Sequence, residues 1–139
     1  MHRPTQTLNR YGLTVEAVEQ DKLSSRLVKV VHQGPELADM NALKAKAEQA
    51  LTQVRYLEDE LHTVEQDEAR QAVILRSVSP EQEPDSLIYY ELLLQQNGET
   101  ELSRKRYQRS TGDTEAVDFT LTDRLLERLG KDLDALSAR

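Results

Sequence analysis

A long stretch of this chain, from about Glu36 to Arg70, contains neither glycine nor proline and constrains the fold more than any other part of the sequence. Its apolar residues recur at alternating spacings of three and four, the a/d pattern of a heptad repeat. They are Met40, Leu43, Ala47, Ala50, Val54, Leu57, Leu61 and Val64. The intervening residues favour helix and Asp39 is a suitable N-cap, so we predict one long helix over about residues 37–70.

The charged residues beside this apolar seam favour antiparallel pairing with a second copy of the chain. Lys44 and Lys46 lie toward its start, and Glu58 and Glu60 toward its end. An antiparallel pair would bring Lys44 near the other copy's Glu58, and Lys46 near its Glu60. We therefore predict a symmetric homodimer through the seam at residues 40–64. Two alternatives are that the stripe packs on the chain's own sheet, as amphipathic helices usually do, or on a helix of another protein.

After Arg70 the apolar period changes to two, which predicts strands. Residues 72–78 favour a strand, residues 79–86 a loop, and residues 117–121 a last short strand. Thr122 and Asp123 then cap a terminal helix with a leucine stripe over about residues 122–137.

Asn97 and Gly98 predict a β-hairpin between residues 87–96 and 99–109, because Asn-Gly is the strongest short signal for a two-residue type I′ turn. That turn would place Leu93 opposite Leu102 and Glu91 opposite Arg104. One face of the hairpin would then point to the core. It carries Ile88, Tyr90, Leu92, Leu94 and Tyr107.

The segment between Gly12 and Gly34 fits either two strands, with a turn near residues 21–25, or one helix. Its β-branched residues favour the strands. With residues 1–10 as a flexible tail, residues 11–139 form a single α+β domain. We predict a mostly antiparallel sheet of four to six strands, with a β-meander over about 72–121. The long heptad-patterned helix and the shorter C-terminal helix would pack on it.

Composition narrows the classes of function. The chain has 139 residues and no cysteine, which excludes thiolate nucleophiles, cysteine zinc sites and iron–sulfur clusters. A net charge of −7 with no tryptophan disfavours nucleic acid as a partner. The start of the chain has no apolar signal segment, and no apolar run approaches the roughly 20 residues of a membrane helix. We expect a cytoplasmic protein without a membrane segment.

A basic run on the second hairpin strand is a candidate anion-binding ribbon. It comprises Arg104, Lys105, Arg106, Tyr107 and Arg109. Cations with an interleaved tyrosine can contact phosphates and stack on a base. The alternative is a solvated strand whose charges are balanced by neighbouring glutamates and split between two faces.

No motif assigns a catalytic, cofactor or metal site. Phosphate-binding glycine loops do not occur, and Asp59 with His62 supplies only half of a carboxylate–histidine metal pair. We predict a non-enzymatic protein-interaction module, such as an adaptor, assembly factor or small chaperone, acting as a homodimer. The alternative is a nucleic-acid or anionic-ligand binding protein that uses residues 104–109; an enzyme with a site assembled from distant residues stays open.

Overall fold

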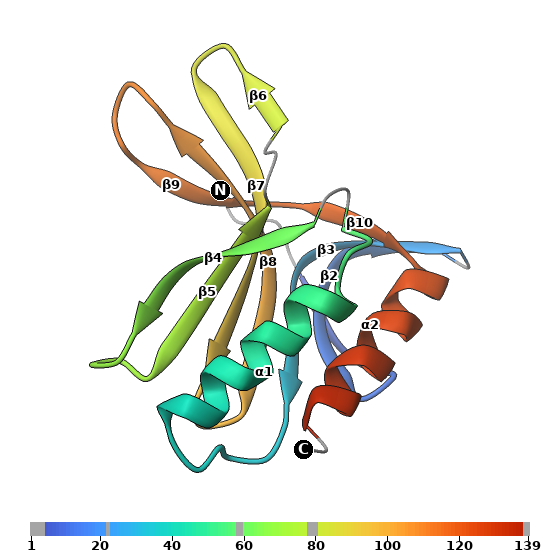
Figure 1. Ribbon diagram of the computed structural model, residues 1–139. Coiled ribbons are helices and arrows are strands. Elements are labelled where there is room, and N and C mark those ends of the chain that lie inside the picture. The colour runs from blue at the N-terminus through green and yellow to red at the C-terminus, as the bar shows by residue number, and fades with distance from the viewer. Residues whose placement is uncertain (1–4, 22, 58–59, 78–80, 138–139) are drawn as a thin grey trace.

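The computed structural model describes residues 5–21, 23–57, 60–77 and 81–137, which form a ten-stranded antiparallel sheet with two helices on one face (Figure 1). The strands are β1 (Gln6–Arg10), β2 (Leu13–Gln20), β3 (Ser24–Gln33), β4 (Leu61–Asp67), β5 (Ala72–Ser77), β6 (Glu81–Glu83), β7 (Ser86–Gln95), β8 (Glu99–Gln108), β9 (Thr114–Val117) and β10 (Phe119–Thr122). The helices are α1 (Met40–Gln53) and α2 (Asp123–Ser137). The sheet order is β1-β2-β3-β8-β7-β5-β4, with β10 paired to β3, β6 to β7 and β9 to β8.

Directly paired apolar residues build the covered face, which we define as the face that carries α1 and α2. One row crosses five strands through Val15, Val30, Leu102, Leu92 and Leu75. Each of these side chains is at most 1% exposed. The leucine stripe of α2 belongs to the same core. Because strand residues alternate between faces, the neighbours of this row point to the opposite, open face.

The predicted fold class is wrong in the size of the sheet and in the length of the first helix. The sheet has ten strands across the described ranges rather than four to six. Helix α1 has 14 residues instead of spanning 37–70. It begins at Met40 rather than near residue 37, and the predicted N-cap Asp39 is confirmed, because Asp39 Oδ1 accepts a hydrogen bond from the Ala42 amide at 2.8 Å. Its end is different, since the chain leaves the helix at Val54 and becomes strand β4 at Leu61.

The heptad spacing continues past the end of the helix because a helix, a connection and a strand can each direct a side chain into the same core. Val54 is the C-cap residue of α1, Leu57 lies in the connection and Leu61 begins β4. All three side chains are at most 5% exposed. Val64 breaks the pattern: it sits at a register irregularity of β4 and is 40% exposed. Helical propensity is a weak prior, and the pairing of β4 with β5 overrides it here.

The N-terminal part of the chain is more ordered than the predicted tail. Residues 6–10 of that tail form β1, which pairs with β2. The segment from Gly12 to Gly34 forms the two strands β2 and β3, as the β-branched residues indicate. The β1–β2 turn packs under α2 at Gly130, where a Cβ atom would lie 2.4 Å from the Tyr11 carbonyl oxygen. A larger residue at Gly130 would therefore push α2 away from the sheet.

The predicted hairpin exists as β7 and β8, but its register differs by one residue. Leu92, not Leu93, faces Leu102, and Glu91 faces Ser103. The turn uses three residues, 96–98, and ends on Gly98 with φ of 95°. Such a loop is the three-residue alternative to a type I′ turn. The shift leaves the faces of β7 as predicted but exchanges those of β8.

Two short strands extend the outer ends of this hairpin beyond the helices (Figure 1). β6 lies inside the predicted loop 79–86 and pairs with β7, while β9 pairs with β8. The predicted strand at 72–78 and the terminal helix are present as β5 and α2. Thr122 caps α2, since its Oγ1 accepts a hydrogen bond from the Leu125 amide at 3.1 Å. Neither helix of the described chain has the length and apolar content that crossing a membrane requires.

Candidate binding site

The residues of the predicted dimer seam lie inside a single copy of the chain. Six belong to the hydrophobic core and are at most 5% exposed: Leu43, Ala47, Ala50, Val54, Leu57 and Leu61. Met40 packs against the same core, and Val64 lies on the open face. A second copy could reach the buried six only by opening the core. In this fold these six residues therefore supply no surface for pairing.

The charges that flank the seam also make contacts within the chain. Lys44 Nζ lies 3.0 Å from Glu68 Oε1, and Arg55 donates to Glu60 Oε2 at 3.2 Å. Lys46 points into the protein and is 4% exposed. Glu58 lies outside the described residues, as does Asp59 of the carboxylate–histidine pair considered above.

Two cations of the basic run are engaged by neighbouring groups. The Arg104 guanidinium stacks on the Tyr90 ring at 4.6 Å, and this arginine is 7% exposed. Arg106 pairs with Glu115 at 3.1 Å and with Glu83 at 3.2 Å. The two carboxylates, Glu115 foremost, raise the pKa of Arg106. Both side chains lie on the covered-face side of β8, but each is engaged by its own neighbours, so they do not form a free cationic patch.

The other two cations of the basic run also contact neighbouring groups. Lys105 Nζ lies 3.6 Å from Glu91 Oε2 on the open face. Arg109 Nη1 donates to the Glu83 carbonyl at 3.4 Å. Tyr107 lines the pocket that becomes the candidate site.

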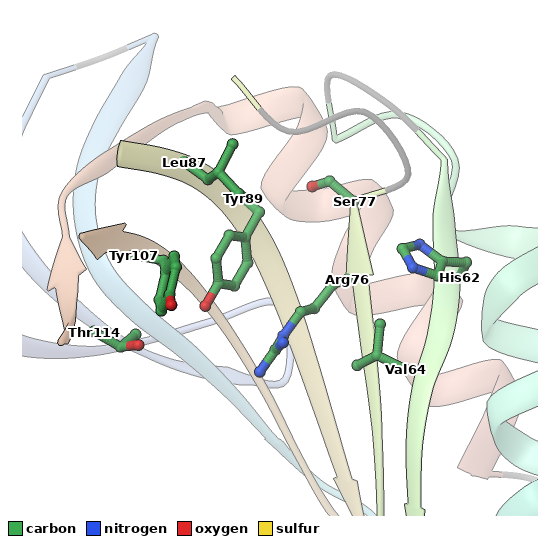
Figure 2. Close-up of a pocket in the computed structure, with 8 residues that line it drawn as sticks. All are labelled: His62, Val64, Arg76, Ser77, Leu87, Tyr89, Tyr107 and Thr114. Atoms are coloured by element: carbon green, nitrogen blue, oxygen red, sulfur yellow. The ribbon is translucent and has the colours of Figure 1, made fainter. Parts of the chain in front are cut away.

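This open-face pocket lies where β4 begins and β5 ends, beside the continuing hairpin of β7 and β8 (Figure 2). Its volume is about 490 Å³. The described residues that line it come from five strands and are His62, Val64, Arg76, Ser77, Leu87, Tyr89, Tyr107 and Thr114. A volume of this size falls in the range of small-ligand sites.

The walls of the pocket are aromatic and aliphatic. Strand pairing places Leu87 beside Tyr107, and Tyr107 beside Thr114. Figure 2 shows Tyr89 and Tyr107 projecting on the same side, with Val64 across from them on β4. Tyrosine combines a large apolar ring with a polar tip, which suits a surface that alternates between water and a bound group.

Arg76 is the permanent cation of the pocket lining, and two neighbours fix its position. Its Nε donates to Glu91 Oε1 at 3.0 Å, and its guanidinium lies 5.0 Å from the Tyr89 ring centroid. Strand pairing places His62 on its other side. Glu91 is shared, because it also pairs with Lys105. The arginine is therefore held over an aromatic ring at the edge of an apolar pocket (Figure 2).

The covered face holds a second polar cluster, which is buried away from solvent. His32 and Thr100 face each other across β3 and β8, and Lys46 reaches them from α1. His32 Nδ1, Lys46 Nζ and Thr100 Oγ1 are buried without a hydrogen-bond partner among the described residues. Burial lowers the pKa of Lys46, and it lowers the pKa of His32 against the opposing effect of Asp134.

Sequence reasoning singled out Tyr107 and His62, each for a different role, but missed the rest of the pocket. Arg76, Leu87 and Tyr89 lie on strands that the sequence does predict, at alternating positions that point away from the core. Their meeting depends on which strands are neighbours and in which register, and the predicted register was off by one residue. Within the described ranges, no group of three or more metal-ligating side chains is close enough to hold an ion.

Comparison of the chain with protein-family models, with curated proteins and with solved structures finds no match.

Proposed function

We propose that this chain is a non-catalytic binding protein that holds an apolar or aromatic group of its ligand in the open-face pocket. The observation that carries the proposal is the gathering of Leu87, Tyr89, Tyr107 and Val64 around about 490 Å³ on the face opposite the two helices of the described chain. Concave sites lined by aromatic and aliphatic side chains with a few polar groups are typical of ligand binding.

The pattern of the two faces supports this assignment. The apolar residues of the covered face are consumed by packing against α1 and α2. The open face is otherwise crossed by charged residues, among them Glu16, Lys29 and Glu91. A cluster of tyrosine, leucine and valine on such a surface costs solvation free energy unless another molecule covers it.

The proposed interaction surface is therefore the open face of the sheet and not the seam that the sequence predicted. The seam residues stabilise the core of a single copy, so they do not support the proposal. The ribbon at 104–109 supports it only through Tyr107, because Arg104 and Arg106 are engaged elsewhere.

The test is an NMR titration of the isotope-labelled full chain with the neutral aromatic alcohol 2-naphthalenemethanol. We expect amide shift changes concentrated on β4, β5, β7 and β8, saturating at millimolar concentration or below. Tyr107→Ala should weaken binding, because it removes one wall of the pocket. Leu23→Ala is the matched control, since Leu23 is 79% exposed but remote from the pocket lining.

Shift changes that spread over the helices, or that persist unchanged in Tyr107→Ala, would show that the probe does not use the pocket. The proposal would then be wrong.

A further inference from the structure

We infer that the ligand carries a carboxylate group that Arg76 binds, so that the pocket accepts a small aromatic or branched aliphatic carboxylic acid. This inference rests on the proposed function and adds the chemical class of the ligand.

The first support is the set of donors that Arg76 still offers. Its described contacts are the Nε hydrogen bond to Glu91 and the stacking on Tyr89. Neither contact uses the edge formed by the two terminal nitrogens, which have no partner among the described residues. That edge presents two parallel N–H groups in the fork that matches the two oxygens of a carboxylate.

The second support is the charge balance around the guanidinium. Arg76 and Lys105 share the single carboxylate of Glu91, at 3.0 Å and 3.6 Å. Two positive charges and one negative charge leave a net charge of +1 for this group of three. Glu91 is largely buried, its side chain being 12% exposed, so the group is held partly out of water. An anion placed on Arg76 would complete the neutralisation.

The third support is the arrangement of the apolar walls relative to the cation. Tyr89 lies beneath the guanidinium, while Leu87 and Tyr107 continue the same face away from it. A ligand with an anionic end and an apolar body would therefore place its body on the tyrosines when its head meets Arg76. Polyphosphates and nucleic acids usually need several free cations, whereas the described pocket lining offers one guanidinium.

The experiment compares 2-naphthoate with 2-naphthalenemethanol, which share the ring system and differ in the carboxylate. Both are titrated into the labelled full chain by NMR, and the variants are Arg76→Gln, Arg76→Lys and, as a matched control, Arg124→Gln. Arg124 is exposed on α2, on the other side of the sheet. Dispersed amide spectra confirm that each variant is folded.

We expect naphthoate to bind wild type about tenfold more tightly than the alcohol, because its carboxylate adds one charge-assisted interaction with Arg76. Arg76→Gln should remove that advantage, so that the variant binds the two probes with equal affinity. Arg76→Lys should retain part of it, because the charge stays while the fork is lost. Arg124→Gln should behave as wild type.

The outcomes separate the two proposals. Equal affinities for both probes in wild type, or an advantage for naphthoate that survives Arg76→Gln, would overturn the carboxylate inference and leave the proposed function standing. Absence of binding by both probes would overturn the proposed function together with the inference. If Arg76→Gln is unfolded, Arg76→Lys decides the question: a reduced advantage for naphthoate supports the inference, and an advantage equal to that of wild type overturns it.

Discussion

Two neighbouring rows of the same sheet show how differently its faces are used. On the covered face, Val15, Val30, Leu102, Leu92 and Leu75 stand opposite one another across five strands. One residue along each strand, the open face carries Glu16, Lys29, Ser103, Glu91, Arg76 and His62. The first row is apolar because helices exclude water from it, and the second is charged because water or a ligand meets it.

The difference assigns stability to the covered face and the proposed binding to the open face. Substitutions in the covered row should change the free energy of unfolding, whereas substitutions in the open row should change binding. Two features depart from this pattern of an apolar covered face and a charged open face. They are the buried polar cluster of the covered face and the apolar pocket of the open face.

The largest expected effect comes from truncating adjacent leucines of β7. Leu92→Ala, at a position that is 0% exposed, should lower the free energy of unfolding by about 2–5 kcal/mol, because it leaves a cavity in the core. Leu93→Ala, on the half-buried open side, should cost less than half as much. Urea denaturation of both variants measures the two values. Equal losses would mean that the open face is as tightly packed as the covered face.

A gain in stability is expected from removing the buried ammonium of the covered face. Lys46→Met should raise the free energy of unfolding by about 1–3 kcal/mol, because Lys46 Nζ is buried without a hydrogen-bond partner among the described residues. Lys105→Met is the open-face control and should give no gain, since it removes a lysine that pairs with Glu91.

The same variant changes the pH dependence at alkaline pH. Because burial lowers the pKa of Lys46 from 10.5 in the folded chain, the unfolded chain binds more protons in the window below 10.5. The stability of wild type should therefore gain a rising contribution as pH increases through that window. Lys46→Met should lose this contribution in denaturation series at several pH values. A slope that is unchanged in the variant would contradict the assignment.

A smaller loss is expected from a tyrosine hydroxyl that joins the connection after α1 to α2. Tyr56 donates to Asp132 Oδ2 of α2 at 2.8 Å, and burial, followed by this bond, raises its pKa. Tyr56→Phe should cost about 0.5–1.5 kcal/mol, the net value of one hydrogen bond. Tyr107→Phe should leave the melting temperature unchanged, because no hydrogen bond of its hydroxyl is found among the described residues. A comparable loss in both would indicate that the pocket hydroxyl also supports the fold.

The smallest effect at neutral pH is expected from His32. Its pKa is lowered from 6.5 mainly by burial, so the unfolded chain binds the extra proton as pH falls below 6.5. Its contribution to stability should be complete above that pH and be lost on acidification, at most about 1.4 kcal/mol per pH unit. His32→Gln should flatten the acid limb of the stability curve. The same substitution at exposed His62 is the control, and a flattened limb there would contradict the prediction.

The sequence located most elements but not their lengths or pairing partners. The alternation of β5, β7 and β8, the caps Asp39 and Thr122, and the α2 stripe each depend on nearby residues. The heptad pattern past Gln53 misled because it records only that side chains return to a core, not that a helix returns them.

The register of the hairpin shows the same limit on a finer scale. Asn97 and Gly98 marked the turn, yet the loop holds three residues and Gly98 packs beside the Gly34 carbonyl, where a Cβ atom would lie at 2.2 Å. That long-range contact is absent from any local window of sequence. The shift of one residue moved Tyr107 to the open face and Arg104 to the covered face.

By itself, then, the sequence determined where the strands alternate, where the helices begin and which leucines of α2 are buried, because propensity, capping and periodicity act between residues close in the chain. Only the tertiary structure decided where α1 ends, which face of β8 meets the helices, and that Arg76, Tyr89 and Tyr107 share one pocket. The physical reason is that pairing across a sheet is set by packing between distant segments, and one residue of register exchanges every side chain between its two faces.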